Sequence, residues 1–166
     1  MLIYIKGPLG YETAYRLYEA NIVQIKKQFP QFFIKRFLEI RENMDDFHIE
    51  KYSEDNYIRE ILSGGLYAGL WEVLEKLKKG CVIDHKKIPL AQETVEVLEL
   101  FKESPYEVSS KGCFLIVSER FIPDAALIGF TNETRDRIMD FGSHKRYLTP
   151  PLRQRKDILV RKGNMK

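Results

Sequence analysis

Two adjacent glycines, Gly64 and Gly65, follow Ser63 and stand directly before the best-defined helical pattern in the sequence. Glycine lets the backbone approach another group closely, and the free amides at the start of a helix suit the oxygens of a phosphate. The same pair also suits a tight turn that packs a helix closely against a sheet. Both interpretations stay open, and Ser63, Gly64 and Gly65 are the candidate anion-binding turn.

Metal-binding residue types are present but scattered. Cys81 and His85 are four residues apart, and His48 and His144 could in principle complete a set of ligands. This spacing matches none of the common zinc patterns, so we expect no metal site. Cys81 and Cys113 each begin an apolar run without an activating neighbour, which predicts two buried, unreactive thiols.

Clusters of charge are expected to be solvated rather than catalytic, and no catalytic residue is assigned. The acidic loop contains Asp45, Asp46 and Glu50. Carboxylates in a loop between two helices generally face water. A lysine group at positions 76, 78 and 79 closes the helix that follows the glycines, where positive charge offsets the helix dipole.

Length and composition indicate a single globular domain. The chain has 166 residues, of which 44% are hydrophobic, and its 27 basic and 24 acidic residues give a net charge of +3. This near balance predicts no nucleic-acid partner. The short apolar run at the amino terminus fits neither a signal peptide nor a membrane span, so we expect a cytoplasmic protein without a membrane partner. The domain should cover residues 1–151, and the basic segment 152–166 should be a flexible tail.

Hydrophobic periodicity predicts a chain that contains both helices and strands. A short helix, capped by Ser53, is expected to lead into the glycines, and Gly80 is expected to cap the helix after them. Strands are predicted at 2–5, 81–84, 113–117 and 125–130, with a hairpin over 137–140 and 145–148. The remaining helices are predicted at 11–29, 33–43, 66–79 and 91–102.

Five segments in order resemble the carboxy-terminal domain of the aminoimidazole ribonucleotide (AIR) synthase-related superfamily. They are SGGLYAGLWEV (63–73), IPLAQETVEV (88–97), SSKGCFLIV (109–117), AALIGFT (125–131) and RYLTPP (146–151). The likeness covers residues 1–151 and is greatest to the branch that contains the hydrogenase-maturation carbamoyl dehydratase.

The resemblance implies an α+β fold with a mixed central sheet packed by helices, in a chain that corresponds to half of an enzyme. Members of the superfamily have two domains and generally form dimers, and their amino-terminal domain supplies acidic metal ligands and much of the ATP site. That domain has no counterpart in this sequence. We therefore expect a homodimer or a companion amino-terminal domain as partner, and no cofactor in isolation, with ATP and magnesium possible only alongside that domain.

The residues before the glycines depart from the superfamily pattern. A histidine, an aspartate and a threonine are expected there, and this chain has Arg59, Glu60 and Leu62 instead. Leucine cannot donate a hydroxyl hydrogen bond to a phosphate. The expected function is thus that of an oligomerising or partner-binding domain without catalysis of its own. The alternative is one half of an ATP-dependent enzyme that needs a separate amino-terminal domain.

A second departure is the shortened connection after residue 117. In the superfamily a whole helix separates the strands that correspond to 113–117 and 125–130, whereas here only Ser118 to Asp124 separate them. A parallel crossover needs about a dozen residues or more. The sequence therefore predicts a tighter antiparallel turn, unless one of the strands is displaced.

Overall fold

A seven-stranded mixed sheet forms the centre of the protein, as the α+β prediction requires. The computed structural model describes residues 1–44, 51, 52 and 56–151. The strand order is β2-β4-β1-β5-β3-β6-β7, and all neighbours are antiparallel except β3 and β6. The strands are β1 (Leu2–Lys6), β2 (Tyr57–Glu60), β3 (Gly80–Asp84), β4 (Phe114–Ser118), β5 (Ala126–Asn132), β6 (Arg137–Asp140) and β7 (Lys145–Tyr147).

One face of the sheet is covered by the helix α4 (Gly65–Leu77). Strand side chains alternate between the two faces, so Ile3 and Ile5 of β1 point toward α4 and Tyr4 points away. The residues of α4 that meet the sheet recur at three- and four-residue steps, as an amphipathic helix requires. The main core contains Leu66, Leu70, Val73 and Leu74 of α4 together with Ile3, Ile5, Leu115, Val117 and Ile128 of the sheet.

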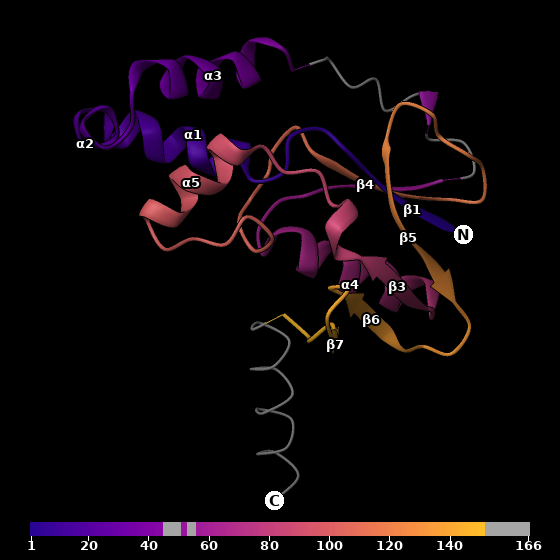
Figure 1. The fold of residues 1–166 in the computed structure, drawn as a ribbon. Coiled ribbons are helices and arrows are strands. Elements are labelled where there is room, and N and C mark those ends of the chain that lie inside the picture. The colour runs from indigo at the N-terminus through magenta and orange to yellow at the C-terminus, as the bar shows by residue number, and fades with distance from the viewer. Residues whose placement is uncertain (45–50, 53–55, 152–166) are drawn as a thin grey trace, which may run out of the picture.

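The other helices gather beyond one end of the strands, at the upper left of Figure 1. They are α1 (Tyr11–Ala20), α2 (Ile22–Gln28), α3 (Gln31–Glu42) and α5 (Gln92–Leu100). Their contacts form a second hydrophobic cluster, in which Phe37 is 1% exposed and packs on Tyr11 and Tyr18. The Tyr11 hydroxyl donates a 2.8 Å hydrogen bond to the Phe37 carbonyl oxygen, which ties α1 to α3.

Three local predictions were wrong. The helix expected over 11–29 is two helices, because the backbone leaves helical geometry at Asn21 (φ −137°, ψ 37°). The segment before the glycines is the strand β2 rather than a helix, and its proposed cap at Ser53 lies outside the described residues. Lys78, at φ 55°, adopts the left-handed conformation that ends α4, whereas Gly80 already belongs to β3.

The connection after β4 is also not the antiparallel turn that was predicted. Strand β1 lies between β4 and β5 and is antiparallel to both, so β4 and β5 run in the same direction. Residues 119–125, which we name the crossover, therefore pass over β1 without a helix. Tyr4 contacts the crossover: its hydroxyl oxygen accepts a 3.2 Å hydrogen bond from the amide of Ile122, which is 4% exposed and packs in the same cluster as Tyr4.

The predicted hairpin of β6 and β7 is confirmed, as are the two buried thiols. The amide of Phe141 donates a 2.9 Å hydrogen bond to the His144 carbonyl oxygen at the hairpin turn. Cys81 and Cys113 are free and fully buried, and burial raises the pKa of each thiol to about 12. Among the described residues, no helix is both long and apolar enough to cross a membrane.

Candidate functional site

The glycine turn at the start of α4 requires glycine for two reasons. Gly64 and Gly65 have φ angles of 85° and 70°, a region that side chains with a Cβ atom rarely adopt. The backbone of another segment also passes close by, since a Cβ atom on Gly65 would lie 2.5 Å from the carbonyl oxygen of Tyr106. The turn therefore packs tightly against residues 106 and 107.

Two of the first amides of α4 already have partners within the protein. Gly65 donates a 2.9 Å hydrogen bond to the Leu62 carbonyl oxygen, and Tyr67 donates a 3.3 Å hydrogen bond to the Tyr106 carbonyl oxygen. Ser63 and Gly64 are exposed, and no acidic side chain stands in the first turn of the helix. Close packing thus accounts for Gly65, while binding of an anion by Ser63, Gly64 and Gly65 stays a prediction.

The three residues that depart from the superfamily pattern have structural contacts of their own. Arg59 forms an ion pair with Glu72 of α4. A side-chain oxygen of Glu60 accepts a 2.9 Å hydrogen bond from the amide of Gly112. Leu62 is 46% exposed at the surface beside the turn and offers no polar side-chain atom.

A cluster of aromatic rings and histidines lies beside the glycine turn and was not predicted. The Tyr67 hydroxyl and His85 Nε2 are 2.9 Å apart, and the His85 ring stacks on Phe141 with centroids 4.2 Å apart. Tyr106 stacks on Tyr67, and His144 stacks on Phe141. Burial lowers the pKa of His85 and raises the pKa of Tyr67 to about 12, so both groups are neutral near pH 7.

The parallel pairing of β3 and β6 explains why these rings meet. Asp84 and Asp140 are partners at the ends of the two strands, so His85 and Phe141 leave the sheet side by side. Parallel pairing is a long-range feature that local periodicity does not reveal. The sequence offered one signal for this cluster, which is that His85 directly follows the strand that ends at Asp84.

The scattered metal-binding residue types are not brought together. Cys81 is buried in the main core, while His85 and His144 belong to the ring cluster. His48 and the acidic residues Asp45, Asp46 and Glu50 lie outside the described residues. Within residues 1–44, 51, 52 and 56–151, no group of three histidine, cysteine or acidic side chains could hold a metal ion.

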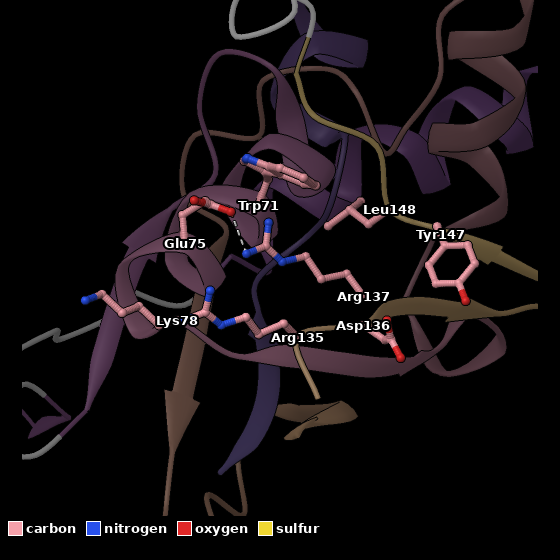
Figure 2. Close-up of a pocket in the computed structure, with 8 residues that line it drawn as sticks. All are labelled: Trp71, Glu75, Lys78, Arg135, Asp136, Arg137, Tyr147 and Leu148. Carbon is pink, nitrogen blue, oxygen red and sulfur yellow. Dashed lines mark ion pairs between the residues drawn. The ribbon is translucent and has the colours of Figure 1, made fainter. Parts of the chain in front are cut away.

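A second site that the sequence did not predict is a cavity of about 320 Å³ at the opposite end of α4. Figure 2 shows Arg137 reaching from β6 toward Trp71 and Glu75 of α4. We name this site the Arg137 cavity. It is lined by Trp71, Glu75, Lys78, Arg135, Asp136, Arg137, Tyr147 and Leu148.

Comparison with known proteins finds similarity in solved structures. No family model and no curated protein sequence matches the chain. HypE from E. coli, a hydrogenase maturation protein, superposes with a TM-score of 0.62 at 20% identity, over 91% of this chain and 51% of that one. HypE in complex with ATP gives 0.61 at 16% identity, over 90% of this chain and 50% of that one. Thiamine monophosphate kinase from Aquifex aeolicus gives 0.56 at 18% identity, over 84% of this chain and 51% of that one.

These matches agree with the resemblance that the sequence segments indicated. The chain spans about half the length of the solved structures it matches. The identities of 16–20% establish the fold and leave the chemistry open. The chain has the fold of one half of a HypE or thiamine monophosphate kinase chain, the fold that its resemblance to the AIR synthase-related superfamily predicts.

Proposed function

We propose that this chain is a partner-binding domain, which joins a companion domain and does not catalyse a reaction alone. The observation that carries the proposal is a row of apolar side chains on the face of the sheet opposite α4. The register of five adjacent strands aligns its members, which we name the apolar row: Leu2, Phe130, Val82, Ile138 and Tyr147.

The apolar row is open to solvent. Phe130 is 49% exposed and Tyr147 is 69% exposed, and the other three members are partly exposed. Each direct pair in the register points to the same face. The described residues therefore leave most of the apolar row uncovered, while Leu2 at its end packs against the cluster of Tyr4, Ile116 and Ile122 that the crossover covers.

An uncovered apolar row of this kind favours binding of another protein surface. Burying apolar area contributes roughly 25 cal/mol per Å², so covering several large side chains would stabilise a complex substantially. A contiguous apolar patch on a soluble domain is a common sign of an interaction surface. Scattered single residues would not have this meaning, but five strands in register form one continuous surface.

A companion domain is the occupant that the structural matches favour. The solved HypE structures are about twice as long as the segment that matches this chain. We propose that a separate domain, corresponding to the remaining half, packs on the apolar row. A second copy of this chain is the other candidate occupant, and the experiment separates the two.

Light scattering after size exclusion chromatography tests this proposal. The chain is run alone and with a separately expressed amino-terminal domain of the HypE type from the same genome. Phe130→Ser should weaken the complex at least about tenfold, because it removes a large apolar contact. Phe32→Ser is the matched control, since Phe32 is 64% exposed but lies on α3.

The outcomes are distinct. A complex that forms with the companion and is lost in Phe130→Ser supports the proposal. A dimer of the chain alone that Phe130→Ser disrupts would replace the companion with a second copy. A wild-type chain that stays monomeric and forms no complex with the companion at roughly 100 μM would contradict partner binding through this face.

A second candidate function is one half of an ATP site. It is favoured by the exposed turn at Gly64, which precedes a helix without an acidic residue in its first turn. Calorimetry with ATP and magnesium, with and without the companion domain, tests it. Heat of binding in the presence of the companion, reduced in Ser63→Pro, is expected if the turn contacts the nucleotide. An absence of heat in both experiments would reject this function.

A further inference from the structure

We propose that the Arg137 cavity binds the oxyanion group of a small organic molecule, either a carboxylate or a phosphate. This site is independent of the proposed partner binding. It lies on the α4 side of the sheet, whereas the apolar row lies on the opposite face. Tyr147 touches both sites and is therefore left out of the experiments.

Arg137 is the central group of the cavity. It is 9% exposed, which is unusual for an arginine on a strand. Its position in β6 explains the burial, because Arg137 shares a face with the buried Met139 and so points toward α4. Its guanidinium carbon lies 4.2 Å from the centre of the Trp71 ring, and Nη2 is 2.7 Å from Glu75 Oε1.

These contacts leave hydrogen-bonding capacity unused at the cavity. Arg137 Nε is buried and donates to no described group, and the same holds for Trp71 Nε1. Burying a donor without an acceptor destabilises the protein. An oxygen atom of a bound anion would supply the missing acceptor for Arg137 Nε. The ion pair with Glu75 fixes the arginine in place but does not satisfy this donor.

The charge of the lining also favours an anion. The cavity holds three basic side chains, Lys78, Arg135 and Arg137, against the two acidic side chains Glu75 and Asp136. Lys78 and Arg135 approach it from turns with φ angles of 55° and 63°. A side-chain oxygen of Glu75 is already engaged by Arg137, so the rest of the charged lining consists of two basic groups, Lys78 and Arg135, and one acidic group, Asp136.

Size and the apolar part of the lining define the ligand class. A volume of about 320 Å³ is at the small end of the range for ligand sites. Trp71 and Leu148 contribute apolar surface beside the charged groups. The site therefore suits a small molecule with one carboxylate or phosphate and a modest apolar portion, rather than a nucleic acid or a long peptide.

Trp71 is the single tryptophan of the chain, so its fluorescence reports directly on this cavity. Emission is followed while sodium phosphate or sodium acetate replaces sodium chloride at constant ionic strength. Wild-type emission should change along a saturable curve for at least one anion, with a dissociation constant in the range of about 0.1–10 mM. Comparing phosphate with acetate shows whether the cavity binds a phosphate group or a carboxylate group.

Variants of the lining residues test whether the change in Trp71 emission comes from binding in the Arg137 cavity. Arg137→Gln should abolish saturation, and Arg135→Asn should weaken the affinity by about 3- to 10-fold, because it removes one cation while asparagine tolerates the left-handed backbone. Arg135 is exposed, so Arg135→Asn keeps the test valid if Arg137→Gln does not fold. Arg16→Gln is the matched control, since Arg16 is an exposed arginine paired with Glu12 on α1.

The inference is overturned if wild-type emission is the same in phosphate, acetate and chloride, or if Arg135→Asn and Arg16→Gln titrate like the wild type. The two proposals fail separately. Phe130→Ser should leave the anion titration unchanged, and Arg135→Asn should leave the companion complex intact.

Discussion

Gly65 and Gly69 lie one turn apart on α4 and have different surroundings. Gly65 has a positive φ, and a Cβ atom there would collide with the Tyr106 carbonyl oxygen. A Cβ atom on Gly69 would meet its nearest neighbour, Leu115 Cδ2, at an ordinary 3.8 Å. One glycine is thus fixed by the packing of the turn, while the other is replaceable.

This contrast gives a prediction for a pair of variants. Gly65→Ala should lower the free energy of unfolding by about 2–4 kcal/mol, from backbone strain together with overpacking. Gly69→Ala should raise it by about 0.5–1 kcal/mol, because alanine favours a helix interior over glycine. Urea denaturation followed by circular dichroism measures both. Equal effects of the two substitutions would contradict the tight packing of residues 106 and 107 on the turn.

At the residue scale, the sequence located the glycine turn and the buried cysteines but missed Arg137. The turn is local, since Ser63, Gly64 and Gly65 are consecutive and the helix after them is strongly periodic. The Arg137 cavity needs β6 to lie beside α4, which the register of distant strands determines. The alternation of Arg137 and Met139 in a predicted strand was a usable signal, because it places a basic residue on the core face.

At the scale of elements, the Tyr4 hydroxyl group is one of several contacts that hold the crossover. It spans residues 119–125 over β1, and the Tyr4 hydroxyl oxygen accepts the hydrogen bond of the buried Ile122 amide. The prediction of an antiparallel turn failed here because it assumed that β4 and β5 are neighbours. The strand between them comes from the start of the chain, and sequence separation does not show this.

Tyr4→Phe tests the role of that hydroxyl. The substitution leaves the Ile122 amide buried without an acceptor, so the free energy of unfolding should fall by about 1–3 kcal/mol. Tyr18→Phe is a control at another aromatic side chain, 8% exposed, that lies in the second hydrophobic cluster. Urea denaturation of both variants provides the measurement. A loss in Tyr18→Phe as large as in Tyr4→Phe would show that the crossover contact has no special importance.

For the whole molecule, the sequence predicted the class and most elements but not the order of strands. Periodicity identified α4 and the hairpin of β6 and β7 because each depends on neighbouring residues. If residues 1–151 form one domain, the main core and the second hydrophobic cluster, which we also call the helical cluster, should unfold together.

Two core variants test this unity. Leu70→Ala in the main core should lower the free energy of unfolding by about 2–5 kcal/mol, and Phe37→Ala in the helical cluster by about 3–5 kcal/mol. In a single domain, Trp71 fluorescence and far-ultraviolet circular dichroism should give coincident transitions in each variant. If Phe37→Ala shifts the dichroism transition and leaves the fluorescence transition in place, the two clusters are separate folding units.

The central place of β1 also bears on how the chain folds during synthesis. Its two neighbours in the sheet, β4 and β5, are more than 100 residues away in the sequence. Leu2 to Lys6 gain one sheet neighbour once Ser118 has been made, yet they lack the second until β5 ends at Asn132. At about 5–20 residues per second, the interval from Lys6 to Asn132 is roughly 6–26 s. During that time one edge of this apolar strand remains available to chaperones.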